Sequence, residues 1–139
     1  MRSLADRAPL LLAAFWWGGL TALSFVAVPL AFAHFGNPAL AGPYAARLFQ
    51  LQSWASLLIS LLLMLGLRRQ DKVVLQGLLP WLLLAALVAL LQEFGVAERI
   101  VNARSSGGDL RFWHAAGTIL VLLQWICALR LFTRLASRP

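Results

Sequence analysis

Few side chains in this sequence have the chemistry of a functional site, and they lie near the ends of long apolar runs. Glu93 and His114 stand out, because a carboxylate and an imidazole can transfer protons or hold a metal ion or polar ligand. Polar groups beside such runs are costly to bury, so each is a candidate for function. The predicted ligand-binding residues are His114, Glu93, Gln50, Gln92, Thr118 and Gln124.

His114 begins a predicted helical face that is small, polar and aromatic, and we expect this face to turn inward. The face continues through Gly117, Thr118, Val121, Gln124, Trp125 and Ala128. Two interpretations of His114 remain open. It is either a buried histidine that hydrogen-bonds a carboxylate or carbonyl, with Glu93 as the natural partner, or a residue that handles a proton, a metal ion or haem.

No short motif supports catalysis. The sequence contains no HxxxH, CxxC, HExxH or phosphate-binding loop, and Cys127 is its one cysteine. We therefore predict no catalytic residue, no enzyme activity and no cofactor. If copper or haem does bind, His114 and His34 are the residues to consider, although their spacing matches no short ligand motif.

The composition indicates an integral membrane protein. Of the 139 residues, 61% are hydrophobic and 12% are charged, and the mean hydropathy is +0.80. A disordered chain needs low hydrophobicity and high charge. A soluble domain of this size cannot hide so much apolar surface.

Four apolar segments are long enough to cross a bilayer, which takes about 20 residues. They cover about 9–35, 43–67, 73–94 and 110–132, within a single domain of residues 1–139. Short links favour antiparallel neighbours, so the predicted fold is all-α, an antiparallel four-helix bundle in the membrane. The polar residues at the ends of the spans then come to similar depth and line a pocket near the outer face. Pro29 lies inside the first span, and we expect a kink of that helix near it.

The charges in the loops predict the orientation, because Lys and Arg concentrate on the cytoplasmic side of a bilayer. Eight of the 12 lie on the side of the termini, and the other four are Arg47, Arg99, Arg104 and Arg111. Both termini are therefore expected in the cytoplasm. This asymmetry and the attraction of anionic lipids account for the net charge of +7 without nucleic-acid binding. The expected partners are the lipid bilayer and other membrane subunits, in a homo-oligomer or a larger complex.

Small residues predict where helices pack in lipid, because they let two backbones approach closely. Two of them are spaced by four residues in the first span, and three serines share one face of the second. The predicted packing residues are Gly18, Ala22, Ser53, Ser56, Ser60 and Gly117.

Two stretches of the chain resemble a known family. The first carries Trp17, Gly18, Gly19, Pro29 and Phe32, then Ala41, Gly42, Arg47, Leu48 and Phe49, and the second carries Leu110, Phe112, His114 and Gly117. They are similar to the transmembrane-protein-205-like family, whose bacterial members are small four-helix membrane proteins of unknown function. The resemblance implies a multi-pass protein of the bacterial inner (cytoplasmic) membrane. Family members often have a serine soon after the histidine, where this chain has Gly117 and Thr118.

Three functions remain open. The leading one is a protein that binds or helps move a small solute or ion through the polar pocket. The histidine-bearing spans also resemble the membrane domain of copper-resistance protein D, which implies a copper- or haem-linked protein that uses His114. The third is a structural or assembly subunit of a larger membrane complex.

Overall fold

The computed structural model describes residues 4–100, 102 and 107–138, and these residues form helices and turns without any strand. Two of the elements, η1 and η2, are short π-helices, and the others are α-helices. In chain order the elements are α1 (Leu4–Ala22), η1 (Leu23–Ala27), α2 (Val28–Phe35), α3 (Pro38–Gln70), α4 (Lys72–Leu90), η2 (Leu91–Ala97) and α6 (Leu110–Ala136).

Four helical segments are long and apolar enough to cross a membrane, namely Asp6–Phe35, Pro38–Gln70, Lys72–Ile100 and Arg111–Ala136. The predicted all-α class with four membrane-length helices is therefore confirmed. The helices extend past the predicted spans, most clearly where the third continues to Ile100 instead of ending near residue 94. Arg2 and Arg104, which entered the charge count, lie outside the described residues.

Polar residues and one glycine define the turns. Gly36 ends α2 in the left-handed conformation, with φ of 60°, which strains a residue that has a Cβ. Asn37 then caps α3 by accepting a hydrogen bond from a backbone N–H with its side chain. Asp71 caps α4 and Asp109 caps α6 in the same way, which satisfies N–H groups that lack a partner inside the helix.

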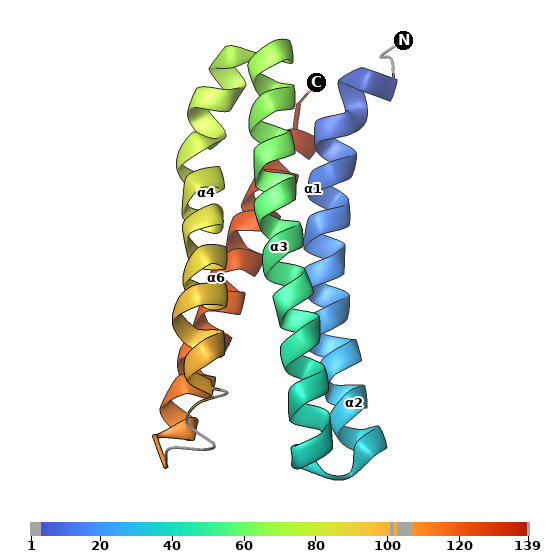
Figure 1. Ribbon diagram of the computed structural model, residues 1–139. Coiled ribbons are helices and arrows are strands. Elements are labelled where there is room, and N and C mark those ends of the chain that lie inside the picture. The colour runs from blue at the N-terminus through green and yellow to red at the C-terminus, as the bar shows by residue number, and fades with distance from the viewer. Residues whose placement is uncertain (1–3, 101, 103–106, 139) are drawn as a thin grey trace.

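Both ends of the chain lie at the end of the molecule that carries the α3–α4 turn, whereas the α2–α3 turn lies at the opposite end (Figure 1). Near the termini the helices enclose one group of packed side chains, which we call the apolar cluster. Its members are Ala13, Trp16, Leu20, Ile59, Leu63, Leu67, Leu78, Leu82, Ala85, Cys127, Ala128, Leu131 and Leu135.

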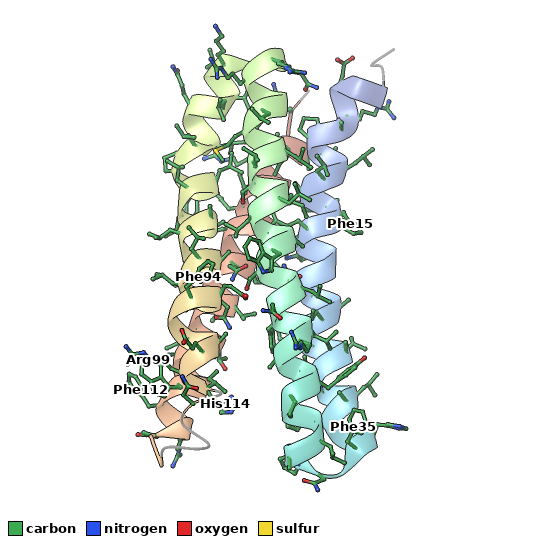
Figure 2. The ribbon with its side chains drawn as sticks, in the orientation of Figure 1. Phe15, Phe35, Phe94, Arg99, Phe112 and His114 are labelled. Atoms are coloured by element: carbon green, nitrogen blue, oxygen red, sulfur yellow. The ribbon has the colours of Figure 1, made fainter. Side chains whose placement is uncertain are left out.

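The outside of the helices carries many large apolar side chains. Phe15 is 73% exposed, and Phe35, Phe94 and Phe112 are exposed as well. Figure 2 shows such side chains along the length of the helices. Exposing so much apolar surface to water is unfavourable in free energy, so these helices suit a lipid environment.

The two π-helices lie in the half of the molecule away from the termini. In η1 the N–H of Val28 donates to the carbonyl of Leu23, five residues back. Pro29 follows at once and has no N–H to donate, and a wider turn is a known way to accommodate a proline inside a membrane helix. η2 spans Leu91–Ala97 and contains Gln92 and Glu93.

The predicted packing residues divide into two groups. Ser53, Ser56, Ser60 and Gly117 are buried between helices. Gly18 and Ala22 are exposed instead, and a Cβ added at Gly18 would meet nothing within 4 Å. The predicted contact of these two with a neighbouring helix is therefore not made within the described chain. Instead, the face of α1 that carries Ala13, Trp16 and Leu20 turns inward.

Candidate functional site

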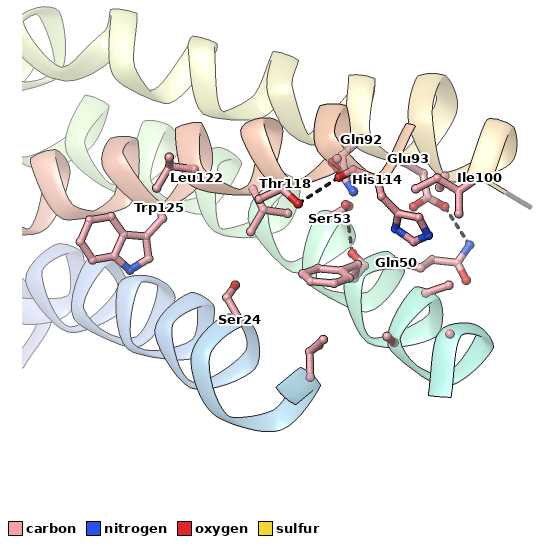
Figure 3. A pocket seen from close by; sticks show the side chains of 18 of the residues that line it. Ser24, Gln50, Ser53, Gln92, Glu93, Ile100, His114, Thr118, Leu122 and Trp125 are labelled. Carbon is pink, nitrogen blue, oxygen red and sulfur yellow. Dashed lines mark hydrogen bonds between the residues drawn. The ribbon is translucent and has the colours of Figure 1, made fainter. Parts of the chain in front are cut away.

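A pocket of about 410 Å³ lies between the helical segments in the half of the molecule away from the termini. Side chains from η1 and α2, from α3, from η2 and from α6 contribute to its walls (Figure 3). Its polar lining residues are Ser24, Gln50, Ser53, Gln92, Glu93, His114 and Thr118.

The structure brings five of the six predicted ligand-binding residues to this pocket: His114, Glu93, Gln50, Gln92 and Thr118. The sixth, Gln124, does not line it. Gln124 is buried at 1% exposure on the same helix as His114, farther toward the apolar cluster. It belongs to the helix interface rather than to the pocket.

Glu93 is held by an amide from α3. The Nε2 of Gln50 donates a hydrogen bond of 2.8 Å to Oε1 of Glu93, and Arg47 in turn donates one of 3.0 Å to Oε1 of Gln50. The guanidinium of Arg47 is exposed, so this chain of two bonds leads from the surface to the carboxylate in the pocket. The partner that the sequence suggested for Glu93 was His114, and in the described residues that partner is Gln50.

His114 is exposed on the first turns of α6, and its imidazole projects into the pocket on the same side as Glu93 and Gln50 (Figure 3). Its backbone carbonyl accepts a hydrogen bond of 2.9 Å from the Thr118 hydroxyl. Within the described residues the imidazole forms no hydrogen bond to Glu93. His114 thus lines the pocket without holding the carboxylate.

Three polar atoms in the pocket wall are buried without a hydrogen-bond partner in the described part of the chain: Ser24 Oγ, Gln92 Oε1 and Glu93 Oε2. Gln92 is only 6% exposed. Buried polar atoms are almost always paired, so an unpaired one marks a position where a water molecule, an ion or a ligand belongs. Three around one cavity mark a site that is prepared for polar contacts.

Gly117 lies where α6 meets η2 in the pocket wall. A Cβ at this position would lie 3.5 Å from Cγ1 of Val96 and 3.6 Å from Nε2 of Gln92. Ser53 is buried at the opposite wall, where its hydroxyl donates to the carbonyl of Phe49 on its own helix. Both residues thus contribute to the pocket as well as to helix packing.

The two histidines do not share a site. His34 lies at the end of α2, exposed, with its ring 5.4 Å from that of Phe35, and it does not line the pocket. Among the described residues no group of three or more His, Cys, Asp or Glu side chains is placed to hold a metal ion. The structure thus does not bring His114 and His34 to one pocket, and metal binding at either histidine stays a prediction.

Sequence reasoning missed the wall that the first helix provides. Ser24 and Phe25 of η1 line the pocket opposite α6, together with Val28 of α2. Pro29 was the available signal, because it marks the irregular turn that carries Ser24. Phe49 of α3 also stands in the wall without having been predicted there, whereas Trp125 lies on the α6 face that was expected to turn inward.

Residues 11–109 match the family described as a domain of unknown function, DUF4149. The match covers the helices from α1 to η2 and ends before α6. No curated protein and no solved structure matches the chain.

Proposed function

The chain belongs to the DUF4149 family, which is defined by a domain of unknown function, and we propose that it binds a small solute or ion in the pocket between its four membrane-length helices. Such binding either retains the solute or is one step in moving it across the membrane. The role requires neither catalysis nor a cofactor. It is also the role that the resemblance to the transmembrane-protein-205-like family leaves open.

The proposal includes a placement in the membrane. The protein is an antiparallel four-helix bundle of the bacterial inner membrane, with both termini in the cytoplasm and the pocket toward the outer face. The excess of Lys and Arg on the side of the termini supports this orientation. A cytoplasmic reporter fused after Pro139 is expected to be active, and an inactive reporter would reverse the orientation.

The observation that carries the proposal is the coincidence of a cavity with unpaired polar atoms. The volume of about 410 Å³ lies within the range of small-molecule pockets. It costs free energy to leave polar atoms without partners in an apolar surrounding, as is the case for Ser24 Oγ, Gln92 Oε1 and Glu93 Oε2. A bound ligand that pairs with these atoms recovers that free energy. A cavity that merely reflects imperfect packing is not expected to be lined by three unpaired polar atoms.

The test uses three small photoreactive probes that share an aryl-alkyl body with a diazirine and end in an ammonium, a hydroxyl or a carboxylate group. The purified chain in lipid nanodiscs is labelled, and the labelled residues are mapped. At least one probe is expected to label residues that line the pocket, and excess unlabelled compound is expected to suppress the labelling.

Two variants of α6 sharpen this test. Val121 is buried and lines the pocket, so Val121→Trp fills it, whereas Ile119→Trp adds the same side chain on the exposed side. Labelling is expected to fall in Val121→Trp alone. If no probe labels the pocket, or if unlabelled compound does not compete, the proposed function is wrong, whether or not Val121→Trp folds.

A role as a subunit of a larger membrane assembly is the second candidate, and the exposed face of α1 favours it. Nothing lies within 4 Å of a Cβ at Gly18 or Gly19, and small residues on a lipid-facing surface suit contact with another helix. Gly19→Leu is expected to abolish co-purification of partner subunits after extraction in mild detergent. A wild-type chain that extracts as a lone monomer would exclude this role.

A further inference from the structure

The described walls of the pocket carry one acidic residue and no lysine or arginine. The acid is Glu93, and the other ionisable side chain in the wall is His114. Arg47 approaches from outside, but its guanidinium contacts Gln50 and not the carboxylate. Among the described lining residues, the acid is therefore not balanced by a lysine or an arginine.

Half of the Glu93 carboxylate is unsatisfied. Oε1 accepts the bond from Gln50, whereas Oε2 is buried and has no partner among the described residues. An ionised carboxylate only accepts hydrogen bonds, and at membrane depth it is stable only when donors or a positive charge compensate it. A donor placed at Oε2 would satisfy this oxygen, and a donor that carries positive charge would also compensate the carboxylate.

Two other unpaired atoms in the pocket wall point to the same chemistry. Gln92 presents Oε1, an acceptor, without a partner, and the side chain is 94% buried, given its exposure of 6%. Ser24 presents a hydroxyl oxygen that also lacks a partner. An ammonium group brings three N–H donors and no acceptor, so it complements a wall whose open atoms are mainly acceptors.

The rest of the lining is apolar and aromatic. Phe25, Phe49 and Trp125 stand in the wall with Val28 and Val121. The faces of aromatic rings attract cations, and the apolar side chains favour contact with a hydrocarbon body. The volume of about 410 Å³ is also much larger than a single metal ion or water molecule needs.

We infer that the pocket takes an amphipathic organic cation, with its ammonium group at Glu93 and Gln92 and its apolar body against the aromatic wall. This inference rests on the proposed function and adds the chemical class of the solute. A neutral or anionic compound of the same shape leaves the Glu93 carboxylate unpaired, so it binds more weakly.

The three probes described above test the inference through their head groups. The ammonium probe is expected to label the pocket at concentrations about tenfold to a hundredfold lower than the hydroxyl probe, which is the effect of one charge-assisted hydrogen bond. Glu93→Gln keeps the size and shape of the side chain and is expected to remove that preference. Glu93→Asp keeps the charge and is expected to retain part of it.

Glu98→Gln is the matched control, because Glu98 is an exposed acid directly after η2 and does not line the pocket. It is expected to label like the wild type. If the hydroxyl and ammonium probes label the pocket equally, or if Glu93→Gln and Glu98→Gln have the same effect, the pocket binds solutes but not cations, and the inference is overturned while the proposed function stands. If no probe labels the pocket, both fail.

Discussion

The apolar cluster and the pocket are built from the same four helical segments, but they differ in how the space between the helices is filled. In the apolar cluster Leu63, Leu82 and Leu131 are at most 1% exposed, and the cavity of about 540 Å³ in this half lies at the edge of the cluster, beside Asp71, Leu135 and Arg138. In the other half the helices leave about 410 Å³ open, and both π-helices lie beside it. Close packing favours one arrangement of the helices, whereas irregular turns around a cavity leave that half adaptable to a ligand.

The two regions also differ in how their polar atoms are satisfied. Next to the apolar cluster, Trp16 Nε1 donates a hydrogen bond of 2.9 Å to Ser56 Oγ, which joins α1 to α3. In the pocket wall three buried oxygen atoms have no partner in the described residues. The separation is incomplete, because Trp17, Ser60 and Gln124 each keep an unpaired polar atom outside the pocket. Close packing thus fixes the arrangement of the helices near the termini, whereas the opposite half keeps polar atoms that can pair with a ligand.

The largest effect is expected from Leu82→Ala in the apolar cluster. Leu82 is fully buried, so the substitution leaves a cavity and is expected to lower the free energy of unfolding by about 2–5 kcal/mol. Leu83→Ala is the control, because Leu83 is adjacent to Leu82 in sequence but is itself 53% exposed on the lipid side. Thermal unfolding in detergent compares the two variants. Equal losses of stability would show that the cluster is no more tightly packed than the surface.

Ser56→Ala is expected to have the next largest effect. The substitution removes the acceptor of two donors, Trp16 Nε1 and Gln52 Nε2, and an unpaired buried donor costs about 1–3 kcal/mol. Ser60→Ala is the matched control, since Ser60 is equally buried on α3 but its hydroxyl has no partner. Unfolding of the two variants under the same conditions measures the difference. If Ser60→Ala is as harmful as Ser56→Ala, the Trp16–Ser56 bond does not join the helices as described.

Much of the fold follows from hydropathy and turn chemistry. Length and apolar content predict four membrane-length helices, because a bilayer accepts little else. Asp109 caps the last helix, in keeping with the preference for aspartate directly before a helix begins. Short links also suggest that Glu93, Gln50 and His114 come to similar depth, and the structure places all three at one pocket.

The sequence could not predict how each helix is rotated about its axis. Spacing by four puts Gly18 and Ala22 on one face, but it does not say whether that face or the face of Trp16 turns inward. The hydrogen bond from Trp16 to Ser56 and the packing around it settle the choice in favour of Trp16. A residue spacing shows which side chains share a face and leaves the direction to tertiary packing.

The π-helices explain why one wall of the pocket was not predicted from the sequence. A π-turn shifts the direction of the side chains that follow it relative to a regular α-helix. Ser24 lies in η1, so a regular 3.6-residue period misplaces it, and the wall that it forms was not foreseen. Glu93 was expected at the pocket, but the hydrogen bond that it accepts from Gln50 was not predicted.

Gly117→Ala tests whether the pocket wall is looser than the apolar cluster. A Cβ at this position makes only ordinary contacts, at 3.5 Å from Val96, so alanine fits. Alanine is the better helix former, and the free energy of unfolding is expected to rise by about 0.5–1 kcal/mol. Gly18→Ala, which enters open space, is expected to give a similar gain in the same unfolding measurement. A loss in Gly117→Ala alone would mean that the pocket wall is packed as closely as the cluster.

The smallest effect is expected at the edge of the apolar cluster, where Arg138 forms an ion pair with Asp71 at the α3–α4 turn. Both side chains are about one third exposed, at 33% and 34%, and ion pairs in such positions contribute about 0.2–1 kcal/mol. Arg138→Gln is therefore expected to reduce stability by no more than this, and the reduction is expected to shrink at high salt because mobile ions screen exposed charges. Arg134→Gln removes the same charge from α6 at a residue with no ion pair among the described residues, and it is expected to leave stability unchanged. A loss in Arg138→Gln as large as that in Leu82→Ala, and insensitive to salt, would mean that this ion pair, rather than packed leucines, holds the terminal half together.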